Sequence, residues 1–87
     1  MSQQTTERRI GFVGIIVNGP EKSYHFLNDI LHQYAFLIVG RQGIPYRERN
    51  LSIISLIVDG SSDDIGALTG KLGQLPDVTV KTGFAKL

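Results

Sequence analysis

Two stretches of this sequence, residues 10–17 and 51–58, are apolar without the alternation of a half-buried strand. A β-strand with one wet face alternates between apolar and polar residues, so these runs indicate strands that are covered on both faces. In the first run, for example, Ile15 points to one face of the strand, and Phe12 and Ile16 point to the other. We therefore expect the two stretches to be the central strands of a sheet.

Two further segments have helical periodicity. Residues 21–35 place apolar side chains at helical spacing on one face, and residues 61–75 do the same until Pro76 ends the pattern. Ser61 and Asp64 have the spacing of a capping box, in which a serine hydroxyl accepts a hydrogen bond from the amide three residues further on. The chain is therefore predicted to contain two amphipathic helices.

The remaining two segments are typical of edge strands. Residues 36–48 are extended but contain Pro45, which cannot donate a ladder hydrogen bond, and residues 77–87 alternate between apolar and polar side chains. The order β-α-β-β-α-β predicts an α+β, ferredoxin-like fold, with a four-stranded antiparallel sheet and two helices on one face. We expect residues 8–87 to form this single domain, preceded by a disordered tail at residues 1–7.

The apolar strands also predict self-association. Two helices cover only one face of so small a sheet, and a second copy of the chain is the most economical cover for the other face. We therefore expect a homo-oligomer, a dimer or a tetramer, built through the sheet. The sequence does not say which face is outward, so the candidate interface residues come from both faces: Phe12, Ile15, Ile16, Ile54 and Leu56.

Composition excludes several classes of function. The chain has no cysteine, which excludes thiol catalysis, a disulfide scaffold and a cysteine-held iron–sulfur cluster. The formal net charge of +1 is too small for a general electrostatic grip on nucleic acid or an anionic membrane. No apolar run approaches the roughly 20 residues of a membrane span, and the polar start has no signal-peptide core, so we expect a cytoplasmic protein. No catalytic set or cofactor motif is present, and we expect neither enzyme activity nor a cofactor.

One ridge of the first predicted helix carries His25, Asp29 and His32. Imidazole and carboxylate groups bind transition metals, so these residues are candidate metal ligands. The two histidines, however, lie about 10 Å apart along a helix axis. We therefore favour a solvated helix face and predict no metal site.

The second predicted helix contains Gly66, Gly70 and Gly73, each of which costs about 1 kcal/mol relative to alanine. Such glycines either pack closely against another element or let a ligand approach the backbone. The pair Gly70-Lys71 is similar to part of a phosphate-binding loop, but Leu72 stands where that loop needs serine or threonine. We favour close packing.

Residues 65–74, Ile-Gly-Ala-Leu-Thr-Gly-Lys-Leu-Gly-Gln, closely resemble a small bacterial family of iron-only hydrogenase system regulators. Residues 43–50 and 78–82 also fit this family, and the resemblance covers residues 9–86. It implies a transcriptional regulator with an ACT-like domain, similar to the ligand-sensing half of the nickel-responsive repressor. The chain departs from that repressor because it lacks a ribbon-helix-helix segment and the cysteine of the nickel site. We therefore expect neither direct DNA binding nor tight nickel sensing.

In ACT domains an effector lies by the turn after the first strand, near a subunit interface. The matching turn here is Asn18, Gly19 and Pro20, and it precedes a helix whose N-terminal amides would favour a carboxylate. The resemblance thus implies a small-molecule effector at this turn, the alternative being a plain tight turn. Two functions follow, a regulatory module that senses a small ligand or a structural accessory protein that binds none.

Overall fold

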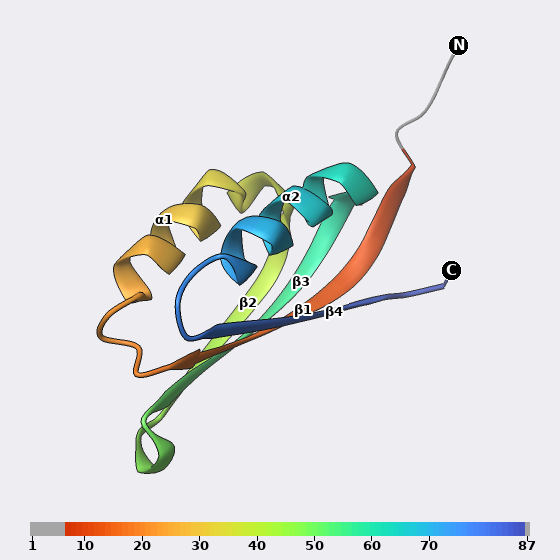
Figure 1. Ribbon diagram of the computed structural model, residues 1–87. Coiled ribbons are helices and arrows are strands. Elements are labelled where there is room, and N and C mark those ends of the chain that lie inside the picture. The colour runs from red at the N-terminus through yellow and green to blue at the C-terminus, as the bar shows by residue number, and fades with distance from the viewer. Residues whose placement is uncertain (1–6, 87) are drawn as a thin grey trace.

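Strands and helices alternate along the chain in the predicted order β-α-β-β-α-β (Figure 1). The computed structural model describes residues 7–86, so most of the predicted tail lies outside the described residues. The strands are β1 (Arg8–Asn18), β2 (Ile38–Tyr46), β3 (Leu51–Ser61) and β4 (Val78–Phe84). The helices are α1 (Tyr24–Gln33) and α2 (Ser62–Gly73), and the short 3-10 turns η1 (Ala35–Leu37) and η2 (Arg47–Arg49) flank β2.

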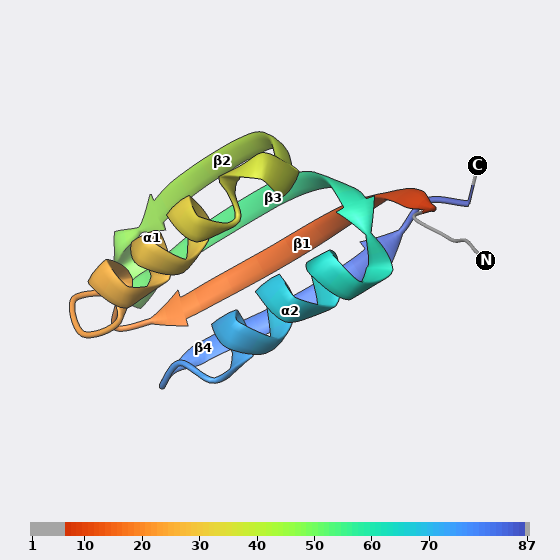
Figure 2. The ribbon, with the colours of Figure 1, turned by 90° about the horizontal axis from the view of Figure 1, so that it is seen from above.

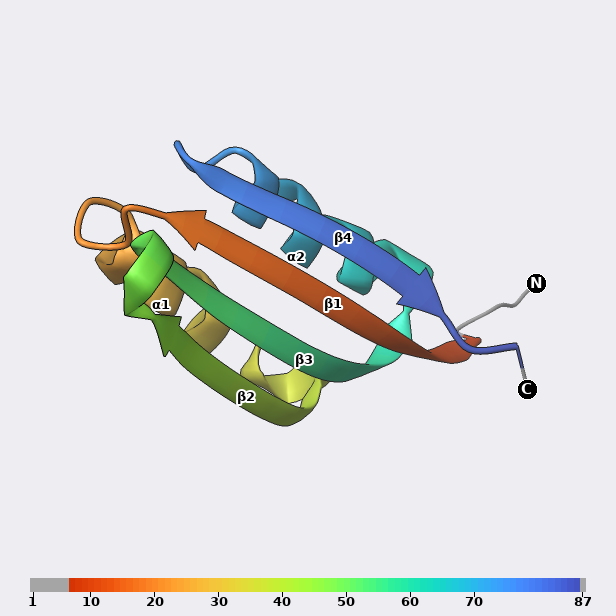
Figure 3. The same ribbon diagram turned by 90° about the horizontal axis from the view of Figure 1, so that it is seen from below.

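The sheet has the order β2-β3-β1-β4, and every neighbouring pair is antiparallel. The two strands with apolar character on both faces, β1 and β3, are therefore central, as predicted. Both helices lie on the same side of the sheet. They are in front of the sheet in Figure 2 and behind it in Figure 3. The ferredoxin-like prediction is confirmed: this is a two-layer molecule with one sheet face covered by helices.

The core lies between the helices and one face of β1 and β3. Every second residue of each central strand is buried there, while the residues between them point away from the helices. Leucines of both helices complete this layer, which excludes water from the apolar surface that holds the domain together. The fully buried side chains of the strands are Val13, Ile15, Val17, Ile54, Leu56 and Val58, and those of the helices are Leu27, Leu31, Ile65, Leu68 and Leu72.

The predicted cap of the second helix is present. Ser61 Oγ accepts a hydrogen bond from the Asp64 amide at 3.1 Å, and Asp63 and Asp64 lie in the first turn, where the helix dipole favours negative charge. The first helix begins at Tyr24 rather than at residue 21, because turns occupy the residues after Pro20. Within residues 7–86, neither helix is long and apolar enough to cross a membrane.

Replacing the cap gives a direct test of this helix start. We expect Ser61→Ala to lower the free energy of unfolding by about 1 kcal/mol, since the Asp64 amide loses its partner. Urea denaturation measures the change. Ser62→Ala is the matched control, because Ser62 is exposed and its side chain makes no cap bond. Equal stability of the two variants would contradict the cap.

Candidate functional site

No helix covers the sheet face opposite α1 and α2 (Figure 3), and this face carries exposed apolar side chains. Phe12 and Ile16 of β1 point to this face and are 53% and 41% exposed, and Ile57 of β3 is 43% exposed. Directly opposed residues of a ladder share a face, and Phe12 pairs with Ile57 while Ile16 pairs with Ile53. Ile53 pairs in turn with Ile44 of β2. These five residues form an apolar surface across three strands, which we call the open sheet face.

The structure divides the five predicted interface residues between the two faces of the sheet. Phe12 and Ile16 lie on the open sheet face and stay candidates for an interface. Ile15, Ile54 and Leu56 are at most 1% exposed beneath the helices. The prediction for these three residues is wrong, because they point to the opposite side of the same strands and belong to the core.

A shallow hollow of about 330 Å³ interrupts the open sheet face. It lies over Gly14 and Ser55, which pair across β1 and β3 and have small side chains or none. Ile16 and Lys81 line its sides. Phe12 points to the same face two residues along the strand from Gly14. A protruding ring and a hollow therefore lie next to one another on this surface.

The turn after β1 is tied into the rest of the fold by its own amides. Gly19 has a φ of +65°, in the left-handed region that favours glycine. The Asn18 amide donates to the Asp77 carbonyl oxygen at 2.8 Å, and the Gly19 amide donates to that of Asn50 at 2.9 Å. Pro20 has no N–H to offer. The amides of Asn18 and Gly19 are therefore not free to bind a carboxylate, because they join three loops instead, and a ligand at this turn stays a prediction.

A larger hollow of about 410 Å³ lies beside this turn, between the start of α1 and the edge strand β2. We call it the Tyr24 hollow. Its walls are largely apolar, and the polar side-chain groups of its lining residues are the Glu21 carboxylate and the hydroxyl groups of Ser52 and Tyr24. The lining residues are Pro20, Glu21, Tyr24, Gly43, Ile44, Pro45 and Ser52.

Of these lining residues, only Pro20 was predicted from the sequence to belong to a ligand-binding site. The available signals were Gly43 and Pro45, which interrupt an edge strand, and Ser52, a polar residue inside an apolar stretch. None of these features by itself predicts a ligand-binding site. Their significance depends on the placement of α1, which only the fold reveals.

The predicted ridge of α1 does not assemble into a metal site. His25 Nε2 lies 3.5 Å from Asp29 Oδ2, and both side chains are largely exposed. His32 is exposed as well. Within residues 7–86, no group of three or more histidine, cysteine, aspartate or glutamate residues is arranged to hold a metal ion. The ridge is therefore a solvated surface with one exposed pair.

The three glycines of α2 face open space. A Cβ atom built on Gly66, Gly70 or Gly73 meets no other atom within 4 Å. The prediction that they pack closely is wrong. The buried stripe of this helix, which includes Ile65 and Leu68, lies on a different face.

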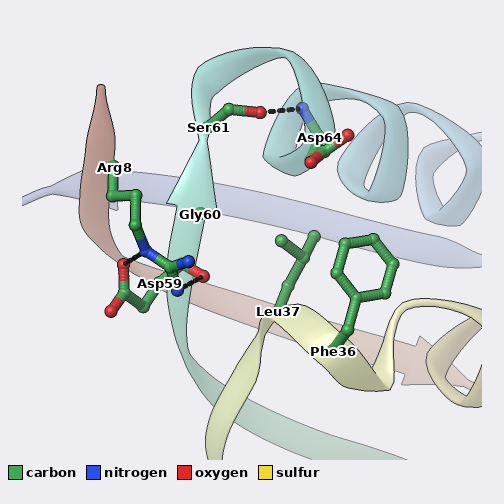
Figure 4. Close-up of a pocket in the computed structure, with 7 residues that line it drawn as sticks. All are labelled: Arg8, Phe36, Leu37, Asp59, Gly60, Ser61 and Asp64. Atoms are coloured by element: carbon green, nitrogen blue, oxygen red, sulfur yellow. Dashed lines mark hydrogen bonds and ion pairs between the residues drawn. The ribbon is translucent and has the colours of Figure 1, made fainter. Parts of the chain in front are cut away.

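A polar hollow of about 300 Å³ lies near the start of α2 (Figure 4). Arg8 Nε donates to Asp59 Oδ1 at 3.1 Å, and Arg8 Nη2 donates to the Asp59 carbonyl oxygen at 3.3 Å. The hydroxyl of Ser61 already accepts the Asp64 amide as the helix cap. Because Arg8 and Asp59 are bonded to each other and Ser61 caps α2, these polar groups stabilise the fold.

Comparison with known proteins identifies one family. A family model described as "Iron-only hydrogenase system regulator, putative" matches residues 9–82. The solved structure of the uncharacterized protein TM1266 from Thermotoga maritima is 44% identical, with a TM-score of 0.89, and the match covers 92% of this chain and 100% of that chain. No curated protein matches the chain.

Two more distant solved structures share the fold. The apo form of CPII from Thiomonas intermedia, a nitrogen regulatory PII-like protein, is 13% identical with a TM-score of 0.56, over 94% of this chain and 96% of that chain. SnoaB from Streptomyces nogalater, a cofactor-independent oxygenase, is 15% identical with a TM-score of 0.56, over 93% of this chain and 94% of that chain. At this level of identity the likeness shows the fold alone.

The exposure of the α2 glycines leads to a prediction about stability. We expect Gly70→Ala to raise the free energy of unfolding by about 1 kcal/mol, since helix propensity improves and nothing obstructs the added methyl group. Urea denaturation measures this change. Gly11→Ala is the contrasting variant, because its Cβ would lie 3.2 Å from Val58 Cγ2 and 3.3 Å from the Gly83 carbonyl oxygen. A loss of stability in Gly70→Ala would restore the packing interpretation.

Proposed function

This chain belongs to the family of iron-only hydrogenase system regulators, and from that premise we propose that it is a homo-oligomeric regulatory module that senses a small molecule. The observation that carries the proposal is the open sheet face. A sheet with one solvated face carries polar residues on that face, whereas Phe12, Ile16 and Ile57 stand there instead. A contiguous exposed apolar surface of this kind marks an interaction site.

A second copy of this chain is the partner we propose for the open sheet face. A standard interface takes about 800 Å² from each partner, roughly one seventh of the 5690 Å² accessible surface of this chain. One whole side of a two-layer molecule supplies that area. Phe12 and the hollow over Gly14 and Ser55 are self-complementary, because in a two-fold pair each ring can enter the hollow of the other copy.

The Tyr24 hollow is the effector site of this proposal. The turn of Asn18, Gly19 and Pro20 helps to form this site. Gly19 has a left-handed backbone conformation that redirects the chain, so that Pro20 and Glu21 line the hollow. CPII has the same fold, and a solved structure shows CPII bound to ADP, AMP and bicarbonate. The fold is therefore compatible with effector binding.

We infer that the protein is not an enzyme. SnoaB shows that this fold can host an oxygenase, so the inference depends on the site rather than on the fold. The Tyr24 hollow contains a carboxylate and two hydroxyl groups, but within residues 7–86 no hydrogen bond joins the Ser52 hydroxyl to a base that would activate it as a nucleophile.

The second candidate function is that of a structural accessory protein that self-associates and binds no ligand. The same open sheet face favours it, and only the Tyr24 hollow argues for the sensing module. The cytoplasmic location and the lack of direct DNA binding stay predictions in either case.

Self-association is tested by placing a charge on the open sheet face. We expect Phe12→Asp to convert the oligomer to a monomer that keeps its circular dichroism spectrum, because a buried unpaired carboxylate is costly at an apolar interface. Sedimentation velocity at micromolar concentration measures the assembly.

Two matched variants complete this test. Phe26→Asp changes another exposed phenylalanine, on α1, and is expected to leave the oligomer intact. Ile15→Asp places the charge in the core and is expected to prevent folding. A folded wild-type monomer at micromolar concentration would remove the proposed assembly.

Ligand sensing is tested by thermal shift with ADP, AMP, bicarbonate, the standard amino acids and simple amines. A compound that binds only the folded state stabilises it by about 2.7 kcal/mol at one hundred times its dissociation constant, so at least one compound is expected to raise the melting temperature. Gly19→Val, which strains the turn, is expected to abolish the response. An unchanged melting temperature with every compound would favour the accessory function instead.

A further inference from the structure

We propose that the Tyr24 hollow binds a small amphiphilic molecule whose apolar body lies against Tyr24 and Pro45 and whose polar group, neutral or cationic, reaches Ser52 and Glu21. This inference rests on the proposed sensing function and names the chemical class of the effector. It differs from the carboxylate ligand that the turn alone would predict.

Ser52 is the first observation that points to a ligand. It is 8% exposed and lies on the inner side of β3, paired with Pro45 of β2. Its hydroxyl makes no hydrogen bond to any residue in the range 7–86. Buried polar groups nearly always make a hydrogen bond. We therefore expect the Ser52 hydroxyl, at the wall of the hollow, to bond to a molecule from outside the chain. That partner can be a donor or an acceptor, because a hydroxyl group serves as both.

The walls of the hollow supply the second observation. Tyr24 is 42% exposed, and Pro20 and Pro45 add further apolar surface. Gly43 leaves the floor open, since a Cβ built there meets no atom within 4 Å. The volume of about 410 Å³ is within the range of small-molecule sites. The space therefore fits an apolar body about the size of a substituted ring.

Charge decides which polar group the molecule carries. Glu21 is the only lining residue that is charged at neutral pH, and the lining includes no lysine, arginine or histidine. The nearby amides of Asn18 and Gly19 already donate to carbonyl oxygens of the chain. An anion would thus meet a like charge, while the amides of Asn18 and Gly19 are already bonded elsewhere. A hydroxyl or a protonated amine instead finds an acceptor in the carboxylate.

Three probes of matched shape test this class: benzylamine, benzyl alcohol and benzoate. Titrations of the full chain are followed through backbone amide chemical shifts. We expect benzylamine and benzyl alcohol to give saturable shifts at Tyr24, Gly43 and Ser52, and benzoate to bind at least tenfold more weakly. Glu21→Gln is expected to weaken benzylamine binding more than benzyl alcohol binding, because only the amine carries a charge that the carboxylate attracts.

A pair of glycine variants controls for the place of binding. Gly43→Leu is expected to fill the hollow and abolish the shifts, while Gly66→Leu, whose glycine also faces open space on α2, is expected to leave them unchanged. Shifts that persist in Gly43→Leu, benzoate binding that equals amine binding, or no saturable shift with any probe would overturn this inference. The proposed function fails separately, if the wild-type chain is monomeric and no compound of any charge raises its melting temperature.

Discussion

The packing of both helices against one face of β1 and β3 determines the rest of this molecule. Side chains alternate along a strand, so once Val13, Ile15 and Val17 are in the core, Phe12 and Ile16 must point away from it. A shift of one residue in the pairing would exchange the two sets. The helices therefore fix which apolar surface is buried within the chain and which one is left exposed.

The elements of this fold could be predicted because each has its own periodicity, whereas the orientation of the central strands could not. Both faces of β1 and β3 are about equally apolar, so hydropathy does not separate Ile15 from its neighbour Ile16. What separates them is the position of α1 and α2, which depends on contacts distant in sequence. For this reason the candidate interface residues came from both faces, and three of the five, Ile15, Ile54 and Leu56, belong to the core.

For the glycines of α2, by contrast, the sequence was sufficient to predict that they face away from the core. At about 100° per residue, Gly66 and Gly70 project more than a right angle away from the stripe that Ile65 and Leu68 begin. Close packing of the glycines against the sheet was therefore excluded by the same periodicity that predicted the helix. The amides of the turn after β1 are different, because their carbonyl partners come from loops far along the chain.

Ile44 lies where the two proposed sites meet. Its pairing with Ile53 places its side chain on the open sheet face, while the neighbouring Gly43 and Pro45 line the Tyr24 hollow on the other side of the same strand. On these two proposals, a ligand that shifts this stretch of β2 would alter the surface offered to a second copy, and by linkage the second copy would alter the affinity for the ligand by the same factor. The proposed effector site and the proposed interface would thereby be coupled through one edge strand.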